Sequence, residues 1–392
     1  WESRRLIPQG YPDFTIFYCA ARILRSGQGA QLYDQATQLR VEREFVAESR
    51  TRYAPLPYNH PPFEAGFFLP FSSLPYLAAF CIWEGINFGI LLALYYLLRR
   101  RFACLTQISV AGWLLFCIAF FPIYVVLLQG QDVLLFVLLL TLAFLALQEN
   151  SDWAAGVYLG LGLFRFHLLA PIVLGLLFQR RLKALATFSL TALALFGLSV
   201  ESVGLHTTLL YPRYVAQIEN DILLRQTVVL PNMTNLRALL DALFGRMVPQ
   251  NVDDVLAIIL SAALAVYTAV IWRKTPVLAF KLGFAACLIA TLLSAYHGLI
   301  HDSSVLILAS VVVADYALSR GAMNRDGLML LLPVFVLSFT PLQALLWYRR
   351  WQGGVIPATL LFWLWRCLRA ERLPGATTMD FVSSASTRGG SL

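Results

Sequence analysis

A carboxylate near the beginning of the chain is the first residue that could do chemistry. Asp13 precedes a stretch in which positions 14, 17, 21 and 24 are apolar or aromatic. These positions share one helical face, so the pattern predicts a helix lying along a membrane surface. On spacing alone, Asp13 is best explained as a cap that accepts hydrogen bonds from the first free N–H groups of this helix. The alternative is a general base held at the membrane–water boundary.

A cation inside an apolar stretch is the second candidate. Arg165 lies in the run Phe164-Arg165-Phe166-His167, within the apolar residues 153–178. An ionisable side chain at membrane depth is costly, and it marks a functional site by default. The structural alternative is an ion pair between Arg165 and a buried acid.

Histidines and polar loop residues complete the set. His297 and His301 are four residues apart, and that helical spacing suits a metal site. No glutamate completes the H-E-x-x-H pattern, so we predict no metal. Taken on their own, Asn235 and Arg237 are best explained as ordinary polar residues of a loop. Gln131 follows an apolar stretch, where it would cap a helix at the interface.

The elements that carry these residues must be membrane helices. The chain has 392 residues, of which 59% are hydrophobic and 13% charged. Soluble domains carry about 25% charged residues, and the mean hydropathy here is +0.68. The composition excludes a soluble domain and a disordered chain, and the long continuous apolar runs exclude a transmembrane barrel. We therefore predict an all-α, polytopic integral membrane protein.

Nine apolar stretches approach the ~20 residues that a bilayer-spanning helix needs. They are residues 75–98, 104–128, 131–148, 184–205, 253–272, 276–295, 300–318, 327–347 and 354–370.

The excess of positive charge predicts the orientation of these spans. The net charge is +8, and no nucleic-acid-binding signature accompanies it, so nucleic acid is not an expected partner. Basic clusters belong on the cytoplasmic side. The clusters are residues 99–101, 180–183, 273–274, 320 with 325, and 366 with 369 and 372. They share one side only if residues 153–179 form a re-entrant hairpin of two half-length helices, which is tolerated where it lines a cavity.

The chain is thus expected to have five parts. They are a first extracytoplasmic segment with interfacial helices (1–63), transmembrane helices including the hairpin (64–205), a second extracytoplasmic segment (206–252), C-terminal transmembrane helices (253–372) and a disordered tail (373–392).

An ordered set of motifs resembles a known family. Two segments look like the start of glycosyltransferase family 87. They are DFTIFYCAARILRSGQGAQLYD, which begins at Asp13, and HPPFEAGFFLPFSSLP, which begins at His60. Three further segments are also similar to that family: residues 128–132, 155–165 and 294–302. His60 replaces a tyrosine of the family pattern, and Arg165 replaces a lysine. Glycines 156, 160 and 162 are spaced like small residues at a helix–helix contact.

The resemblance implies a GT-C-like helical bundle and a reaction. Members of the family are mannosyltransferase-like and use polyprenyl-phosphate sugars. The implied reaction is inverting transfer of a hexose, mannose above all, to a hydroxyl of a glycolipid or glycan acceptor. Asp13 would be the general base, and the donor phosphate would be held by Arg165, His301 and Arg237, with no cofactor or metal required. The implied substrate-binding residues are Tyr18, Tyr33, His60, Gln131, His167, Asn235 and His297.

Location and alternatives follow from the same reasoning. We expect a multi-pass protein of the plasma (inner) membrane, in contact with membrane lipids, with an extracytoplasmic active site. The alternative is a transporter or flippase of a lipid-linked sugar, because broken helices with a buried arginine suit that function too. Another GT-C transferase, with a different sugar or a protein acceptor, is the third possibility.

Overall fold

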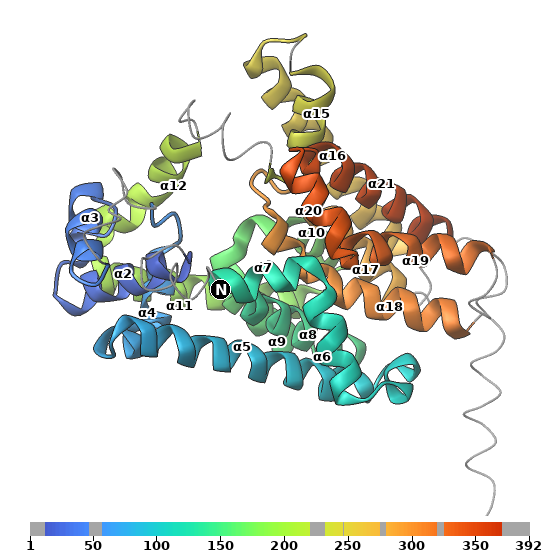
Figure 1. The fold of residues 1–392 in the computed structure, drawn as a ribbon, viewed down its shortest axis with the longest axis horizontal. Helices are drawn as coiled ribbons and strands as arrows, with labels where there is room; N and C mark the ends of the chain where they lie inside the picture. Colours follow the sequence, from blue (N-terminus) through green and yellow to red (C-terminus); the bar gives the residue numbers. More distant parts are fainter. Residues whose placement is uncertain are drawn as a thin grey trace, which may run out of the picture.

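The computed structural model describes residues 12–46, 57–219, 232–245, 247–274, 280–319 and 325–370. The predicted tail, 373–392, lies outside these ranges, as do parts of both predicted extracytoplasmic segments. The described residues are helical, and the extended pairing among them is one isolated bridge between Met233 and Leu299. The predicted all-α fold is confirmed (Figure 1).

Helices and 3₁₀ turns follow one another through the described ranges. In order they are α2 (Phe14–Arg25), η2 (Gly29–Gln31), α3 (Gln35–Arg43), α4 (Pro62–Phe67), η4 (Leu69–Ser73), α5 (Tyr76–Arg99), η5 (Ala103–Gln107), α6 (Val110–Ala119), α7 (Phe121–Gln129), α8 (Val133–Gln148), α9 (Asp152–Leu161), η6 (Gly162–Leu168), α10 (Ala170–Phe178), α11 (Leu182–Val203), α12 (Leu205–Glu219), α15 (Leu236–Phe244), α16 (Gln250–Lys274), α17 (Phe280–Ser294), η9 (Ile300–Val305), α18 (Leu306–Ser319), α19 (Arg325–Ser338), α20 (Thr340–Tyr348) and α21 (Gln352–Ala370).

Fewer helices have the length of a full span than the apolar stretches suggest. In the described ranges four helical segments are long and apolar enough, or six if two bent pairs each count as one span. The bent pairs are α6 with α7, at 83°, and α19 with α20, at 62°. Each break precedes a helix with proline in its first turn, Pro122 and Pro341, because a proline inside a continuous helix would lack a backbone hydrogen bond and clash with the preceding turn. Hydropathy alone does not report such breaks.

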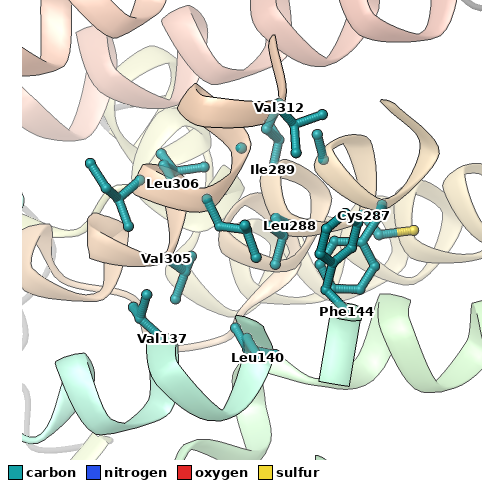
Figure 2. Close-up of a cluster of buried hydrophobic side chains, with 14 of the residues drawn as sticks. Val137, Leu140, Phe144, Cys287, Leu288, Ile289, Val305, Leu306 and Val312 are labelled. Atoms are coloured by element: carbon teal, nitrogen blue, oxygen red, sulfur yellow. The ribbon is translucent and has the colours of Figure 1, made fainter. Parts of the chain in front are cut away.

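The centre of the bundle is formed by α8, α17 and α18. Figure 2 shows Val137, Leu140 and Phe144 of α8 facing the side chains of α17 and η9–α18. Every residue of α17 from Leu282 to Leu293 is buried. A helix that is apolar all round is buried in protein or faces lipid, and α17 is of the first kind. By contrast, only five of the 22 residues of α11 are buried, as expected of a helix in contact with lipid.

The basic clusters gather at one end of the bundle. Arg101, after α5, pairs with Glu149 after α8. Arg181 pairs with Asp152 across 2.7 Å, and the Lys281 ammonium donates to the Arg101 carbonyl at 3.5 Å. The first two basic clusters therefore share one side, as the charge analysis requires.

The C-terminal helices bring their basic residues to the same end. The Asp315 carboxylate of α18 lies 3.7 Å from Lys281. One residue later, the Tyr316 hydroxyl donates to the carbonyl of Ala370, the last residue of α21. Arg366 of α21 pairs with an aspartate at the start of α19, at 2.6 Å.

The segment from α9 to α10 turns back inside the protein. The two helices have 10 and 9 residues, about 14–15 Å each, or half of a ~30 Å hydrocarbon core. Between them Arg165 leaves the helical conformation, with φ −116° and ψ 46°. Because Asp152 and Arg181 form an ion pair, the segment begins and ends on one side, as the predicted hairpin requires.

Glycines allow α9 to pack closely against α11. A Cβ at Gly156 would collide with the Thr187 hydroxyl and the Ala184 carbonyl, and one at Gly160 would collide with Thr191. The predicted small-residue contact is confirmed for both. Gly162 serves another contact, because its Cβ would lie 3.0 Å from the ring of Phe136.

The first helix is more enclosed than its amphipathic pattern suggests. Nine residues of α2 are buried, including Phe14 and Phe17, by α3, α4, η4 and the start of α5. Figure 1 shows α2, α3 and α12 grouped at one end of the molecule. In the described structure the helix is thus covered by protein instead of presenting one face to a membrane surface.

The side occupied by the basic end can be tested by labelling. Leu182 is 67% exposed next to Arg180 and Arg181. In a Cys81→Ser background, we expect Leu182→Cys to react with an impermeant thiol reagent only after cells are permeabilised, because basic loops stay in the cytoplasm. The matched control is Ser73→Cys, which is exposed before α5 at the opposite end and should react in intact cells. Labelling of Leu182→Cys from outside would reverse the assigned orientation.

Candidate active site

The Asp13 carboxylate is not a helix cap. Its backbone is helical, with φ −66° and ψ −17°, and within the described structure its side chain accepts no capping hydrogen bond. A genuine cap stands nearby for comparison. Asp34 has an extended backbone, with ψ 113°, and accepts from the Thr37 amide at 2.9 Å. The capping interpretation of Asp13 is therefore wrong, and its carboxylate is available for another purpose.

Gln131 holds Asp13 from the turn between α7 and α8. Its Nε2 donates to Asp13 Oδ2 at 2.7 Å. This approach depends on Gly130, whose φ is +64° and whose Cβ, if present, would lie 2.8 Å from the Cβ of Phe14. Only glycine lets the turn come so close to the start of α2.

Arg165 lies on the other side of Gln131, deep in the protein. Its side chain is 5% exposed. Nη2 donates to Gln131 Oε1 at 2.7 Å, and Nη1 donates to Asp302 Oδ1 at 2.9 Å. Nε and Nη2 both donate to Asp132 Oδ1, the former at 3.1 Å. The ion-pair alternative considered from the sequence is thus present, with two acids. A guanidinium has five N–H donors, and these bonds use four.

His301 belongs to the same cluster through its neighbour. The ring nitrogen Nε2 lies 3.7 Å from Asp302 Oδ2, and the ring is buried. The ring therefore lies beside the carboxylate that pairs with Arg165. Asp302 is in turn positioned by the Leu299 amide, which donates to its Oδ2 at 2.9 Å. Asp13, Arg165 and His301, distant in sequence, therefore converge.

His297 and His301 do not share a regular helix. His297 lies in the irregular segment between α17 and η9, so their spacing does not place them on one helical face. The His297 ring is perpendicular to that of His167, with 6.4 Å between centroids. This loop therefore brings His297 near η6, the turn that carries both Arg165 and His167.

A second group of polar side chains joins the site behind Asp132. His60 Nδ1 lies 2.8 Å from Glu64 Oε2. Burial, together with the neighbouring Asp132 carboxylate, raises the pKa of Glu64 well above its usual range. Burial and the charge of Arg165 lower the pKa of His60 to about 3, so its imidazole is neutral at pH 7.

Tyr18 and Tyr33 have structural partners. The Tyr18 hydroxyl donates to the Leu74 carbonyl at 2.7 Å, and the Tyr33 hydroxyl donates to the His60 carbonyl at 2.8 Å. Both side chains are buried. Their observed contacts hold α2 and η2 against the segments around α4 and α5, and their predicted contact with substrate remains a prediction.

Asn235 and Arg237 contact the residues just before His297. Asn235 caps α15 by accepting from the Ala238 amide, and its amide group donates to the carbonyls of Ala295, at 2.9 Å, and Tyr296. Arg237 lies over the Tyr296 ring, 4.1 Å from its centroid, and its Nε is 3.1 Å from Asp254 Oδ1. These residues therefore support the irregular segment that carries His297 and leads into η9, which contains His301.

Three acids of the site were not singled out from the sequence. Glu64, Asp132 and Asp302 are all buried. Each lies within a few residues of a chosen candidate, His60, Gln131 and His301 respectively. Arg165 could have led to these acids, because a buried arginine requires acidic partners and few acidic residues border the apolar stretches.

These features define a class of protein. A bundle of membrane helices encloses a polar site in which a carboxylate, a guanidinium and imidazoles meet from distant segments, as in an enzyme embedded in a membrane. Residues 58–295, more than half of the chain, match glycosyltransferase family 87, and the chain belongs to that family. It is therefore a glycosyltransferase that acts on a sugar donor and an acceptor. No curated protein and no solved structure shows significant similarity to it.

The matched region covers only part of the site. It contains Arg165 and Arg237, but it begins after Asp13 and ends before His297 and His301. The functional roles of these three residues thus depend on the motif resemblance and the geometry.

Proposed function

We propose that the protein transfers a hexose, in the first instance mannose, from a polyprenyl phosphate to a hydroxyl group of a glycolipid or glycan. The observation that supports this most is the uncapped Asp13 carboxylate, held by Gln131 at 2.7 Å in one network with Arg165. A capping carboxylate is directed at the backbone N–H groups of its own helix, whereas Asp13 is directed at Gln131 and keeps acceptor capacity for a substrate hydroxyl.

Asp13 acts as the general base in this proposal. An alcohol is a weak nucleophile at neutral pH, so a carboxylate removes its proton as the oxygen attacks the anomeric carbon. The new C–O bond forms on the face opposite the phosphate, and the old C–O bond breaks with its electron pair leaving on the phosphate oxygen. A single displacement inverts the anomeric centre, and a β-linked donor gives an α-linked product.

The leaving group needs charge stabilisation but no general acid. A lipid phosphate is already ionised at neutral pH, and cations and N–H donors hold its charge in the transition state. In this proposal the remaining N–H of Arg165 and the ring of His301 contact the phosphate, with Arg237 at the periphery. Neither a cofactor nor a metal takes part in the transfer. The predicted contacts of Tyr18, Tyr33, His60, Gln131, His167, Asn235 and His297 belong to this proposal, in which these residues surround the sugar and the acceptor.

Location follows from the two ends of the bundle. The basic clusters lie at one end, and α5, α8 and α18 place their other ends toward the site. With basic loops in the cytoplasm, the site faces the extracytoplasmic side of the plasma (inner) membrane. Membership in a glycosyltransferase family favours the transferase over a flippase.

A direct transfer assay tests the proposal. Purified full-length protein in detergent would receive polyprenyl-phosphate [¹⁴C]mannose and a membrane lipid extract as acceptor. We expect label in a new glycolipid or glycan that α-mannosidase releases. A nucleotide-activated mannose serves as the control donor and should give no product. Transfer from the nucleotide donor alone would overturn the donor assignment, and a product resistant to α-mannosidase but cleaved by β-mannosidase would overturn inversion.

A further inference from the structure

Three side chains, that of Asp132 among them, form a compact group of metal-ligand type. One ligand atom each from His60, Glu64 and Asp132 lies within 4.8 Å of the others. The residues come from separate places, the turn before α4, α4 itself and the α7–α8 turn. Their exposed fractions are 9%, 0% and 1%, so solvent does not separate them.

Two oxygen atoms in this group have no donor. Among the described residues, neither Glu64 Oε1 nor Asp132 Oδ2 accepts a hydrogen bond, although both are buried. The other oxygens are occupied, since Glu64 Oε2 contacts His60 and Asp132 Oδ1 accepts from Arg165. Buried carboxylate oxygens without a partner are costly and rare in folded proteins. Each of the two therefore calls for a positively charged or hydrogen-bearing partner.

The charge of the region points the same way. In the described structure Glu64, Asp132 and Asp302 are three fully buried carboxyl groups, and Arg165 is the one guanidinium that contacts them. Buried charges are stable only when they are paired or coordinate a metal. Arg165 contacts Asp302 and the Oδ1 atom of Asp132, so among the described residues no guanidinium or ammonium contacts Glu64 or the Oδ2 atom of Asp132.

We propose that His60, Glu64 and Asp132 bind a divalent transition-metal cation. A neutral imidazole with two carboxylates is a ligand set that suits Zn²⁺ and Mn²⁺. In a tetrahedral site, ligand atoms at ~2.1 Å from the ion are about 3.4 Å from one another, so a shift below about 1 Å by each of the three side chains closes the site. Three protein ligands leave at least one position for water.

The bound cation would have a structural consequence. It joins the turn before α4 to the α7–α8 turn, which carries Gln131. That residue holds Asp13, so the metal would stabilise the positions of both without taking part in the transfer reaction. The proposal does not depend on the identity of the sugar or of the donor.

Metal binding can be measured on the full chain without a substrate. Protein purified in detergent would be stripped with EDTA and dialysed against Zn²⁺ or Mn²⁺ in separate experiments. We expect one ion per chain by elemental analysis, and a Tm that rises with metal concentration because the folded state binds the ion. For Glu64→Gln and His60→Phe we expect affinity at least 10–100-fold lower, the loss seen even when a residue that only supports a ligand is replaced.

Glu84→Gln is the matched control. Glu84 is a partly buried carboxylate of α5 that accepts from the Asn87 amide at 3.1 Å and lies outside the group. That variant should bind metal like the wild type. A wild-type chain that binds no stoichiometric Zn²⁺ or Mn²⁺ would overturn the proposal and leave a shared proton between Glu64 and Asp132. Undiminished binding by His60→Phe and Glu64→Gln would also overturn it. If one variant fails to fold, the other variant and the wild-type titration still test whether the group binds a metal ion.

Discussion

Replacing Asp13 with asparagine should slow sugar transfer by roughly 10²–10⁴-fold, the contribution of a positioned general base. The fold should be unchanged, because asparagine keeps the shape of the side chain and an oxygen that accepts the 2.7 Å hydrogen bond from Gln131. What it loses is the ability to take a proton. The measurement is the initial rate of transfer from the polyprenyl-phosphate donor, with the Tm recorded on the same preparation.

Asp34→Asn is the control for this experiment. It makes the same chemical change at the start of the next helix, where Asp34 caps α3 through the Thr37 amide at 2.9 Å. Asparagine caps helices about as well as aspartate, so the transfer rate and the Tm should both stay near the wild-type values. If Asp13→Asn behaves like Asp34→Asn, Asp13 is not the base.

The helical membrane fold was predictable because it depends on quantities that a sequence carries directly. Long apolar runs, few charges and basic clusters determine it, and the ion pair between Arg181 and Asp152 agrees with the predicted return of the hairpin. Which apolar helix faces lipid was not predictable. Residues 280–294 and 182–203 are both apolar, yet α17 is buried in the bundle and α11 is largely exposed.

The sequence predicted several residues of the site, but it did not predict which of them contact one another. Local spacing suggested that Asp13 is a cap, and it carries no information about Gln131, which approaches from 118 positions away. The tertiary contact replaced the local one because the turn at Gly130 comes against α2. In the same way, the sequence indicated that Arg165 requires a partner without identifying Asp132 or Asp302. Pairing across such distances is decided by packing.

Replacing Arg165 with methionine should lower the free energy of unfolding by about 3–5 kcal/mol, the cost of leaving a buried charge without its partner. Asp132 and Asp302 are 1% and 0% exposed and share this guanidinium, so both lose their counter-ion at once. Arg165→Lys should lie between methionine and the wild type, because an ammonium keeps the charge but has three donors for the four bonds observed. Thermal or denaturant unfolding of the detergent-solubilised protein measures the effect.

A neutralised variant separates the structural role of Arg165 from its role toward the donor phosphate. Arg165→Met combined with Asp132→Asn and Asp302→Asn removes all three charges, so that none of these residues leaves a buried charge without its counter-ion. Measured in metal-stripped protein, this variant should recover most of the lost stability.

The transfer rate of the same variant tests the contact with the phosphate. A hydrogen bond to a charged group contributes ~1.5–3 kcal/mol. If Arg165 contacts the phosphate, transfer should therefore remain on the order of 10–100-fold slower than in the wild type, although the fold is restored. Restored stability with a wild-type transfer rate would leave Arg165 as a structural ion-pair partner alone. A single Arg165→Met variant with wild-type stability would contradict the ion-pair argument itself.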